Sequence, residues 1–550
     1  MLMGEMMGRP LLVSHIIDYA ADVHATTDIV SVTTEGGIHR YGYAEARRRI
    51  VRLANALRDM GIKPGDRVAT LAWNGYRHFE LYYAVSGIGA VCHTINPRLF
   101  ADQISYIVNH AQDTILFFDL TFTPLVEKLR PALPPALRYA AMTDRAHMPA
   151  ETSLPGLLCY EEIVAAGAPG IVWPELDENA ACALCYTSGT TGEPKGVLYS
   201  NRSTVLHALF VLASCGKSLQ KTKRVLPVVP LFHANAWGLP YAAPLAGCTL
   251  VFPGAKLDGA SLFNLMDNES VTAAWGVPTV WQGLLVEMQK QGRKPKALAD
   301  MLTGGSAAPL SLIETFERDY GVEVVHGWGM TEMSPVGTVT RLGTDEQALP
   351  FEERVHIKTR QGRRLFGVEL KLVGPDGQRL PHDGVATGEL FVRGPAVVRG
   401  YYNNPDASAR ALDGEGWFGT GDVARITPDG YLVIVDRTKD LIKSGGEWIS
   451  SIDVENAAVG CPGVASAAVI AVPHPKWGER PLLIAVKAPG ANPSKDEMLQ
   501  HLSATLAKWQ LPDDVVFVDE IPLTATGKIS KLELRSRFAS YRLPSAAVSA

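Results

Sequence analysis

Residues 186–196 read Tyr-Thr-Ser-Gly-Thr-Thr-Gly-Glu-Pro-Lys-Gly, a run that is typical of a loop that binds phosphate. Glycines let backbone N–H groups approach an anion, Ser and Thr hydroxyls add short donors, and lysine adds a positive charge. The run is not a Walker A loop, because the position five residues after Gly189 is Pro194 rather than glycine. The sequence therefore predicts a phosphate-binding loop of another kind.

The segments on either side of this loop support that interpretation over a solvated linker. Residues 181–186 form an apolar run short enough for a buried strand, and residues 203–212 have the apolar spacing of a helix. Phosphate-binding loops occur in settings of this kind, between a strand and the element that follows it.

Seven further motifs follow in order along the chain. They are Pro-Leu-Phe-His at 230–233, Gly-Trp-Gly-Met-Thr-Glu at 327–332, Gly-Glu-Leu at 388–390 with Arg-Gly-Pro at 393–395, Gly-Trp-Phe-Gly-Thr-Gly-Asp at 416–422, Asp-Arg-Thr-Lys-Asp at 436–440, Lys-Ser-Gly-Gly-Glu at 443–447 and Pro-Leu-Thr-Ala-Thr-Gly-Lys at 522–528. With the loop, they resemble the adenylate-forming superfamily of acyl-CoA synthetases, firefly luciferase and peptide-synthetase adenylation domains. The resemblance is closest to bacterial medium- and long-chain fatty-acyl-CoA synthetases and 3-methylmercaptopropionyl-CoA ligases.

Length and composition are those of a multidomain soluble protein. A chain of 550 residues exceeds what one hydrophobic core organises, so at least two domains are expected. The net charge of −5 gives no electrostatic reason to expect a nucleic-acid partner. No run of about 18 apolar residues predicts a membrane span, and the N-terminus lacks the pattern of a secretory leader.

Seven cysteines, an odd number, predict reduced thiols and a cytoplasmic location. Cys182 and Cys185 form a C-x-x-C pair, but no second pair or histidine partner for zinc lies nearby. Since the pair lies within an apolar strand, both thiols are expected to pack in the core.

The order of predicted elements indicates an α/β fold. Up to about residue 430, strand-like runs such as 67–72 and 114–118 alternate with amphipathic stretches such as 43–60, which predicts layered α/β sheets. Residues 366–436 predict a β-rich subdomain, and 437–550 a small α+β domain. The resemblance implies an N-terminal adenylation domain at 1–436 for acid and ATP, a hinge at 437–442 that contains Lys439, and a mobile C-terminal lid at 443–550.

A carboxylate that attacks the α-phosphorus of ATP meets another anion, so the site needs cations and oriented donors more than an acid–base pair. The resemblance implies that Lys528 contacts the carboxylate and the α-phosphate during adenylation. It places His233 near the acyl carbonyl and the thiol path, as an orienting or gating group. Lys443 is the third expected catalytic residue, on a lid that turns between two half-reactions.

The resemblance also implies the nucleotide site. Glu332 is expected to bind Mg²⁺ together with Thr187, because magnesium is held by one or two carboxylates plus substrate phosphates. Asp422 and Arg437 are expected at the ribose, and Trp328, where the family usually has tyrosine, at the adenine. The expected ATP-binding residues are Thr187, Ser188, Gly189, Thr190, Thr191, Lys195, Ser306, Ala307, Gly327, Trp328, Gly329, Met330, Thr331, Asp422 and Arg437.

Two apolar segments, 233–241 and 276–281, resemble the acid-pocket walls of fatty-acyl-CoA synthetases, in which the Trp237 position is a gate to the acyl tunnel. No aspartate stands early in the pocket motif to bind an α-amino group, which disfavours amino-acid adenylation. The expected acyl-binding residues are Trp237, Val280, Gly304, Gly305 and Pro335. The expected CoA-binding residues are Ser444, Gly445, Gly446 and Trp448, whose glycines suit a backbone pressed against a narrow ligand.

The resemblance implies an ATP-dependent carboxylic acid:CoA ligase that forms an acyl-AMP intermediate from a fatty or other apolar acid such as 3-methylmercaptopropionate. ATP, Mg²⁺ and CoA are the expected cofactors and co-substrates, and a homodimer is the expected assembly. Two alternatives stay open within the superfamily, a luciferase-like oxygenase and an adenylating enzyme that loads a carrier protein. A non-catalytic scaffold is a third, against which the intact Glu332, Asp422, Arg437, Lys443 and Lys528 argue.

Overall fold

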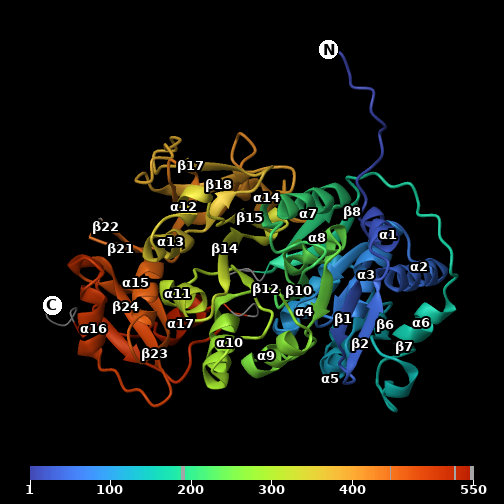
Figure 1. Ribbon diagram of the computed structural model, residues 1–550, viewed down its shortest axis with the longest axis horizontal. Helices are drawn as coiled ribbons and strands as arrows, with labels where there is room; N and C mark the ends of the chain where they lie inside the picture. The colour runs from blue at the N-terminus through green and yellow to red at the C-terminus, as the bar shows by residue number, and fades with distance from the viewer. Residues whose placement is uncertain (188–192, 446, 525–527, 545–550) are drawn as a thin grey trace.

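The fold is described for residues 1–187, 193–445, 447–524 and 528–544 of a computed structural model (Figure 1). The expected phosphate-binding residues Ser188, Gly189, Thr190 and Thr191, and the expected CoA-binding residue Gly446, lie outside the described residues. The chain runs from the N-terminal segments at the right of the view to the C-terminal segments at the left.

The larger sheet has 13 strands among the described residues, and the direction of its strands changes along its length. Its order is β17 (Glu369–Val373), β18 (Gly388–Arg393), β19 (Phe418–Ile426), β20 (Tyr431–Arg437), β16 (Gly362–Arg364), β15 (Val336–Val339), β14 (Glu323–Gly329), β13 (Asp300–Thr303), β12 (Ala273–Gly276), β10 (Arg224–Pro227), β11 (Thr249–Phe252), β1 (Asp28–Val32) and β2 (Ile38–Gly42). Strands β14 to β1 in this order pair in parallel, and the others pair antiparallel.

A second sheet, of seven strands within the described ranges, ends at the phosphate-binding loop. Its order is β7 (Leu158–Cys159), β6 (Arg138–Ala141), β5 (Asp113–Phe118), β3 (Arg67–Leu71), β4 (Val91–Thr94), β8 (Ala181–Thr187) and β9 (Lys195–Ser200). The strands predicted at 67–72 and 114–118 are β3 and β5. The apolar run that contains Cys182 and Cys185 is β8, and both thiols are buried, as predicted.

Helices cover and separate these two sheets. In the N-terminal half they are α1 (Val13–Val23), α2 (Tyr43–Asp59), α3 (Tyr76–Gly87), α4 (Ala101–Ala111), α5 (Thr123–Leu129), α6 (Tyr160–Ala166), α7 (Asn201–Cys215), α8 (Leu239–Ala246), α9 (Gly259–Asn268) and α10 (Pro278–Gln291). Helix α2, predicted at 43–60, buries an apolar face that includes Ile50, Leu53 and Leu57. Helix α3 is buried along its whole length, because it contacts β1 of one sheet and β8 of the other.

The segment predicted to be β-rich, residues 366–436, contains strands β17 to β20, and these extend the larger sheet through β16. The turn glycines Gly377 and Gly430 have φ of 78° and 89°, a region that glycine adopts without steric cost. Of four shorter helices, α14 (Pro405–Ala411) lies between β18 and β19. The others come earlier in the chain, α11 (Leu310–Arg318) between β13 and β14, and α12 (Thr344–Gln347) and α13 (Phe351–Lys358) between β15 and β16.

The C-terminal part has its own sheet and its own core. The sheet order is β22 (Glu447–Ile449), β21 (Ile442–Ser444), β24 (Gly478–Lys487) and β23 (Val464–His474), with β25 (Asp514–Phe517) paired to β24. Three helices complete it, α15 (Ser451–Val459), α16 (Lys495–Ser503) and α17 (Lys531–Arg537). The mixed α/β fold, with a large N-terminal domain and a small α+β C-terminal domain, was predicted correctly.

Candidate functional site

Lys195, Tyr401 and Glu332 lie together beside the phosphate-binding loop. The loop joins β8 to β9, where Thr187 pairs with Lys195 across the two strands. The Lys195 ammonium lies 4.9 Å from the centre of the Tyr401 ring, and the Tyr401 hydroxyl donates a 2.8 Å hydrogen bond to Glu332 Oε1. These contacts hold the lysine, the tyrosine and the carboxylate together next to the start of β9.

Glu332 is the predicted carboxylate ligand of Mg²⁺. Its surroundings fit a cation. It is 6% exposed, and burial raises the pKa of its carboxyl, against the lowering effects of Tyr401, Arg437 and Lys195. Among the described residues no group of three or more His, Cys, Asp and Glu side chains could hold a metal by itself. A single buried carboxylate beside a phosphate loop matches magnesium, which keeps water and substrate phosphate as its other ligands.

Asp422 joins two other predicted nucleotide residues. Its Oδ2 accepts a 2.9 Å hydrogen bond from Trp328 Nε1, and its Oδ1 forms a 2.7 Å ion pair with Arg437 Nε. Asp422 and Arg437 are opposite each other on β19 and β20, and Trp328 lies near the end of β14. The aspartate side chain is buried and the arginine side chain is 43% exposed, so the pair joins a buried carboxylate to a guanidinium that solvent reaches.

Lys528, from the C-terminal part of the chain, lies near these residues. A Cβ atom added to Gly305 would lie 3.3 Å from Lys528 Cε, which places the lysine beside the end of β13. Burial and the nearby Arg437 charge lower the pKa of Lys528 to about 8, while the negative charges of Asp422 and Glu332 oppose this effect. One lysine is thus brought together with both carboxylates of the candidate site.

His233 lies near enough to Lys528 for the lysine charge to act on its imidazole. Burial and the Lys528 charge lower the pKa of the His233 imidazole to about 3. The ring is therefore neutral at pH 7, so that it can donate or accept a hydrogen bond without carrying charge. This state agrees with an orienting group rather than an acid.

Two glycines that were predicted for the acid pocket, Gly304 and Gly305, lie next to Trp237. A Cβ atom on Gly304 would lie 3.4 Å from Trp237 Cη2, and one on Gly305 would lie 3.8 Å from Trp237 Cζ2 and 3.4 Å from Val277 Cγ1. Trp237 itself is 6% exposed. Because residues 304 and 305 have no side chains, the Trp237 indole and the Lys528 side chain can both approach this part of the backbone.

The remaining predicted residues of the pocket and of the nucleotide site belong to the neighbouring strand ends. Pro335 lies against Gly329, where an added Cβ would be 2.0 Å from the Pro335 carbonyl oxygen. The Pro335 carbonyl also accepts a 3.0 Å hydrogen bond from the Met330 N–H. Val280 is half-buried in the first turn of α10. The rest lie at the ends of β13 and β14 or just after them: Ser306, Ala307, Gly327 and Thr331.

Strands β21 and β22 and the turn between them contain the described residues that were predicted for CoA, namely Ser444, Gly445 and Trp448. Lys443 is exposed, with its ammonium 5.3 Å from the centre of the Trp448 ring, and Trp448 is 48% exposed. Ser444 Oγ accepts a 2.9 Å hydrogen bond from Arg480. Lys439, the predicted hinge residue, is exposed in the turn after β20. The structure therefore brings Lys528, and not Lys443, into the site.

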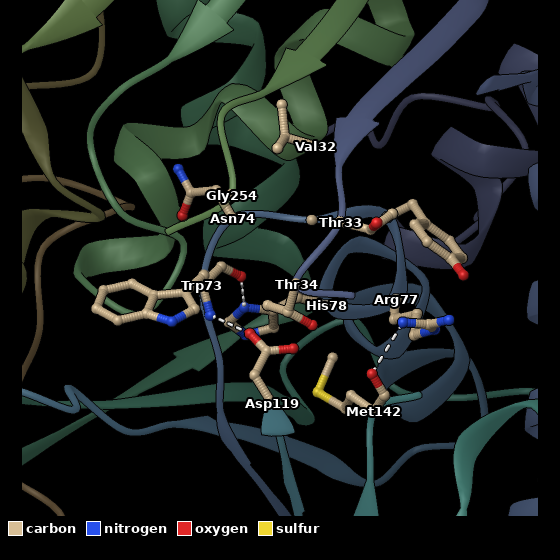
Figure 2. A pocket seen from close by; sticks show the side chains of 12 residues that line it. Val32, Thr33, Thr34, Trp73, Asn74, Arg77, His78, Asp119, Met142 and Gly254 are labelled. Atoms are coloured by element: carbon tan, nitrogen blue, oxygen red, sulfur yellow. Dashed lines mark hydrogen bonds between the residues drawn. The ribbon is translucent and has the colours of Figure 1, made fainter. Parts of the chain in front are cut away.

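Asn74 is a supporting residue that the sequence did not reveal. It lies just before the N-terminus of α3, in the lining of a small cavity of about 20 Å³ that includes none of the predicted site residues (Figure 2). Its side-chain amide donates to the carbonyls of Pro227 and Val229 at 2.8 and 3.0 Å, and its Oδ1 accepts from Leu231 N at 2.6 Å. These bonds fix the segment that leads to His233.

The same cavity contains a buried carboxyl. Asp119 accepts a 2.7 Å hydrogen bond from the Trp73 N–H, and burial raises its pKa to about 7 (Figure 2). Neither Asn74, Asp119 nor Tyr401 belongs to a recognisable motif. Their roles come from contacts with distant parts of the chain, which leave no local pattern.

The chain matches two protein-family models. Residues 19–402 match the AMP-binding enzyme family, and residues 453–528 match the AMP-binding enzyme C-terminal domain.

Several curated proteins are similar over nearly the whole length. A 3-methylmercaptopropionyl-CoA ligase of Ruegeria lacuscaerulensis is 52% identical, over 98% of this chain and 99% of that protein. A medium-chain-fatty-acid–CoA ligase of Ectopseudomonas oleovorans is 46% identical over 99% of both chains. A long-chain-fatty-acid–CoA ligase of Thermus thermophilus is 46% identical over 98% of this chain and 97% of that protein.

Solved structures share the fold. An anthranilate CoA ligase in complex with anthranoyl-AMP superimposes with a TM-score of 0.85 at 24% identity, covering 97% of this chain and 99% of that chain. ATP-bound MatB from Rhodopseudomonas palustris gives a TM-score of 0.80 at 24% identity, covering 96% and 99%.

Proposed function

The chain belongs to the AMP-binding enzyme family, and from this premise we propose that it is an ATP-dependent, AMP-forming acid:CoA ligase acting on a short or medium apolar acid. One observation supports the chemistry above all. The Lys528 ammonium lies near Asp422, Glu332 and His233. We infer that this is where the carboxylate of the acid and the α-phosphate of ATP would meet.

The first half-reaction is the attack of the acid on the α-phosphorus of ATP, which releases pyrophosphate. Lys528 would offset the repulsion between the two anions, and Arg437, which lies near Lys528, would add a second positive charge. Asp422 would accept the ribose hydroxyls, since a carboxylate has lone pairs beyond those that Trp328 and Arg437 use. Neutral His233 would orient the acyl carbonyl.

Glu332 and Thr187 are the proposed ligands of Mg²⁺. The metal, when bound, neutralises phosphate charge. The Tyr401 hydroxyl holds the Glu332 carboxylate in place, and Lys195 adds positive charge beside it. Residues 188–191 are proposed to hold the β- and γ-phosphates, on the strength of their composition alone.

The second half-reaction is the attack of the CoA thiol on the acyl-AMP, which releases AMP. We propose that residues 443–550 turn about the hinge at 437–442, around Lys439. This rotation would replace Lys528 at the site with residues of the β21–β22 hairpin, namely Lys443, Ser444, Gly445, Gly446 and Trp448. The exposed position of the β21–β22 hairpin supports this, because Lys443 and Trp448 are available to a ligand. The remainder, residues 1–436, is the proposed acid- and ATP-binding domain.

The proposed substrate class rests on the relatives and the pocket. Similar proteins carry the names of ligases for 3-methylmercaptopropionate and for medium- and long-chain fatty acids. The Trp237 indole lies next to Gly304 and Gly305. In the proposed apolar pocket it would limit the length of the acyl chain, which favours a short or medium acid, including a thioether acid.

Location and assembly are further parts of the proposal. Seven free, buried cysteines support a cytoplasmic enzyme. No helix in the described part of the chain has both the length and the apolarity needed to cross a bilayer. A homodimer rests on the family resemblance, and light scattering of the purified chain tests it.

The deciding experiment is pyrophosphate release from ATP and Mg²⁺ with straight-chain, thioether and aryl acids, each with and without CoA. We expect release that needs an acid, rises with CoA and peaks at one class of apolar acid, with acyl-CoA and AMP as products. Release without dependence on CoA would favour an adenylating enzyme with another acceptor, and no release with any acid would contradict the ligase.

A further inference from the structure

A buried left-handed turn joins His233 to helix α8 and carries Trp237. Residues 234–237 have φ of 44°, 52°, 48° and 57°, and Gly238 follows at 81°. Non-glycine residues rarely adopt this region, because Cβ crowds the following carbonyl, and a succession of them persists only where the surroundings fix the backbone. The turn is therefore held by its neighbours and not by its own conformational preference.

Asn235 provides the side-chain contacts that fix the turn. It is buried, and its Oδ1 lies 3.1 Å from the Tyr82 hydroxyl and 3.4 Å from Cys185 Sγ. Asparagine also tolerates the left-handed region better than most residues. Backbone groups of Ala234 and Asn235 hydrogen-bond to the same sulfur, so Cys185 of β8 also holds the backbone of the turn.

Tyr82 connects the turn to the segment before it. Its hydroxyl donates to the Leu231 carbonyl and also lies against Asn235, so one fully buried tyrosine of α3 contacts both sides of His233. At the other end, a Cβ on Gly238 would lie 2.8 Å from His207 Nδ1. His207 Nε2 in turn accepts a 3.0 Å hydrogen bond from Val336 N.

The position of this turn determines the position of the Trp237 indole. The indole lies against the Gly304 and Gly305 backbone, and Gly305 also faces Lys528. A small displacement of the turn would therefore change the space next to the expected carboxylate position. Among the described residues, the contacts of Asn235 and Tyr82 are with each other, with Leu231 and Cys185 and, for the Tyr82 ring, with His78 and Tyr241, and not with Gly304, Gly305 or Lys528.

We propose that Asn235 and Tyr82 are positioning residues that set acyl-chain selectivity by holding the left-handed turn, and with it Trp237, against the acid pocket. The inference rests on the proposed acid:CoA ligase activity and identifies how its substrate range is set. Asn235 holds the backbone in the left-handed region, and Tyr82 restrains the side chain of Asn235.

The test compares Tyr82→Phe and Asn235→Gly with the matched control Tyr83→Phe. Asn235→Gly keeps the left-handed backbone accessible and removes only the side-chain contacts. Tyr83 is also a buried tyrosine of α3, but its hydroxyl donates a 2.6 Å hydrogen bond to Pro240 in α8, outside the turn. For each variant, kcat/KM is measured for saturated acids of increasing length, together with KM for ATP and Tm.

We expect Tyr82→Phe and Asn235→Gly to raise kcat/KM for longer acids, relative to the preferred acid, by about fivefold, which is the effect of losing about one hydrogen bond. KM for ATP should stay the same, and Tyr83→Phe should keep the wild-type ratio. If Tyr82 acts through Trp237, Tyr82→Phe adds no further change when it is combined with Trp237→Ala.

Unchanged chain-length ratios in both variants, at wild-type Tm, would overturn the positioning role while leaving the ligase activity intact. An additive effect of Tyr82→Phe on Trp237→Ala would also overturn it, because the tyrosine would then act elsewhere. Absence of acid-dependent pyrophosphate release by the wild-type chain would overturn both the ligase and this inference.

Discussion

At the scale of single residues, the site depends on the charge of Lys528. Its charge acts on a histidine that is neutral at pH 7, and the charges of Asp422 and Glu332 act on it. We expect Lys528→Ala to lower acyl-AMP formation by about 10²–10³, because it removes a cation from beside the reacting anions and leaves Arg437 and Lys195 as the positive charges near these carboxylates. Thioester formation from supplied acyl-AMP should be retained. Equal loss of both half-reactions would contradict the role, and single-turnover assays of each distinguish the outcomes.

The lowered pKa of Lys528 predicts a pH dependence. The lysine is charged below its pKa of about 8 and loses its proton above it, so kcat/KM for adenylation should fall as pH rises through about 8. His233, with a pKa of about 3, stays neutral between pH 6 and 9 and adds no ionisation in that window. Rates of pyrophosphate release from pH 6 to 9.5 check this. A profile that stays flat to pH 9.5 would show that the charge of Lys528 is not required.

At the scale of elements, the sequence predicted the strands and helices better than the contacts that hold the site. The phosphate loop, Glu332, Asp422 and Lys528 could be predicted because each lies in a short motif with its own composition. Asn74 and Tyr82 were not found, because each acts by a side-chain bond to a distant backbone segment. The left-handed turn at 234–237 was missed for a similar reason, since Ala-Asn-Ala-Trp contains no glycine to indicate it.

A junction between β20 and α15 also belongs to this scale. Asp436, at the end of β20, accepts hydrogen bonds from Ser451 N at 2.6 Å and Ser451 Oγ at 2.7 Å, at the start of α15. Lys531 of α17 donates to the same hydroxyl and forms a 2.8 Å ion pair with Glu455. Because the proposed hinge lies between Asp436 and Ser451, these bonds hold the C-terminal domain in the arrangement that presents Lys528.

We therefore expect Ser451→Ala to lower the rate of acyl-AMP formation by about five- to tenfold, since it removes the hydrogen bond from the Ser451 hydroxyl to the Asp436 carboxylate across the hinge. Thioester formation from supplied acyl-AMP should be unchanged or faster. Ser494→Ala is the matched control, because Ser494 caps α16 within the C-terminal domain and makes no bond across the hinge. If both variants slow adenylation equally, the effect is one of domain stability, which Tm would report.

At the scale of the whole molecule, the arrangement of the two domains presents one lysine and leaves another outside. Lys528 lies near Asp422 and Glu332, and Lys443 is exposed beside Trp448 on the same small domain. The two lysines belong to different segments of this domain, the loop before α17 and β21. If each half-reaction uses a different lysine, as proposed, the domain must turn between them.

This requirement predicts opposite effects for the two lysines. Lys443→Ala should leave acyl-AMP formation within about twofold of wild type and slow thioester formation by about 10², because only the turned domain would bring Lys443 to the thiol. Quenched-flow measurement of acyl-AMP and acyl-CoA in single turnovers resolves the two steps, and Lys476→Ala, which removes another exposed lysine of the same domain, is the control. If Lys443→Ala impairs adenylation as strongly as Lys528→Ala, both lysines act in one arrangement, and the proposed rotation about Lys439 is wrong.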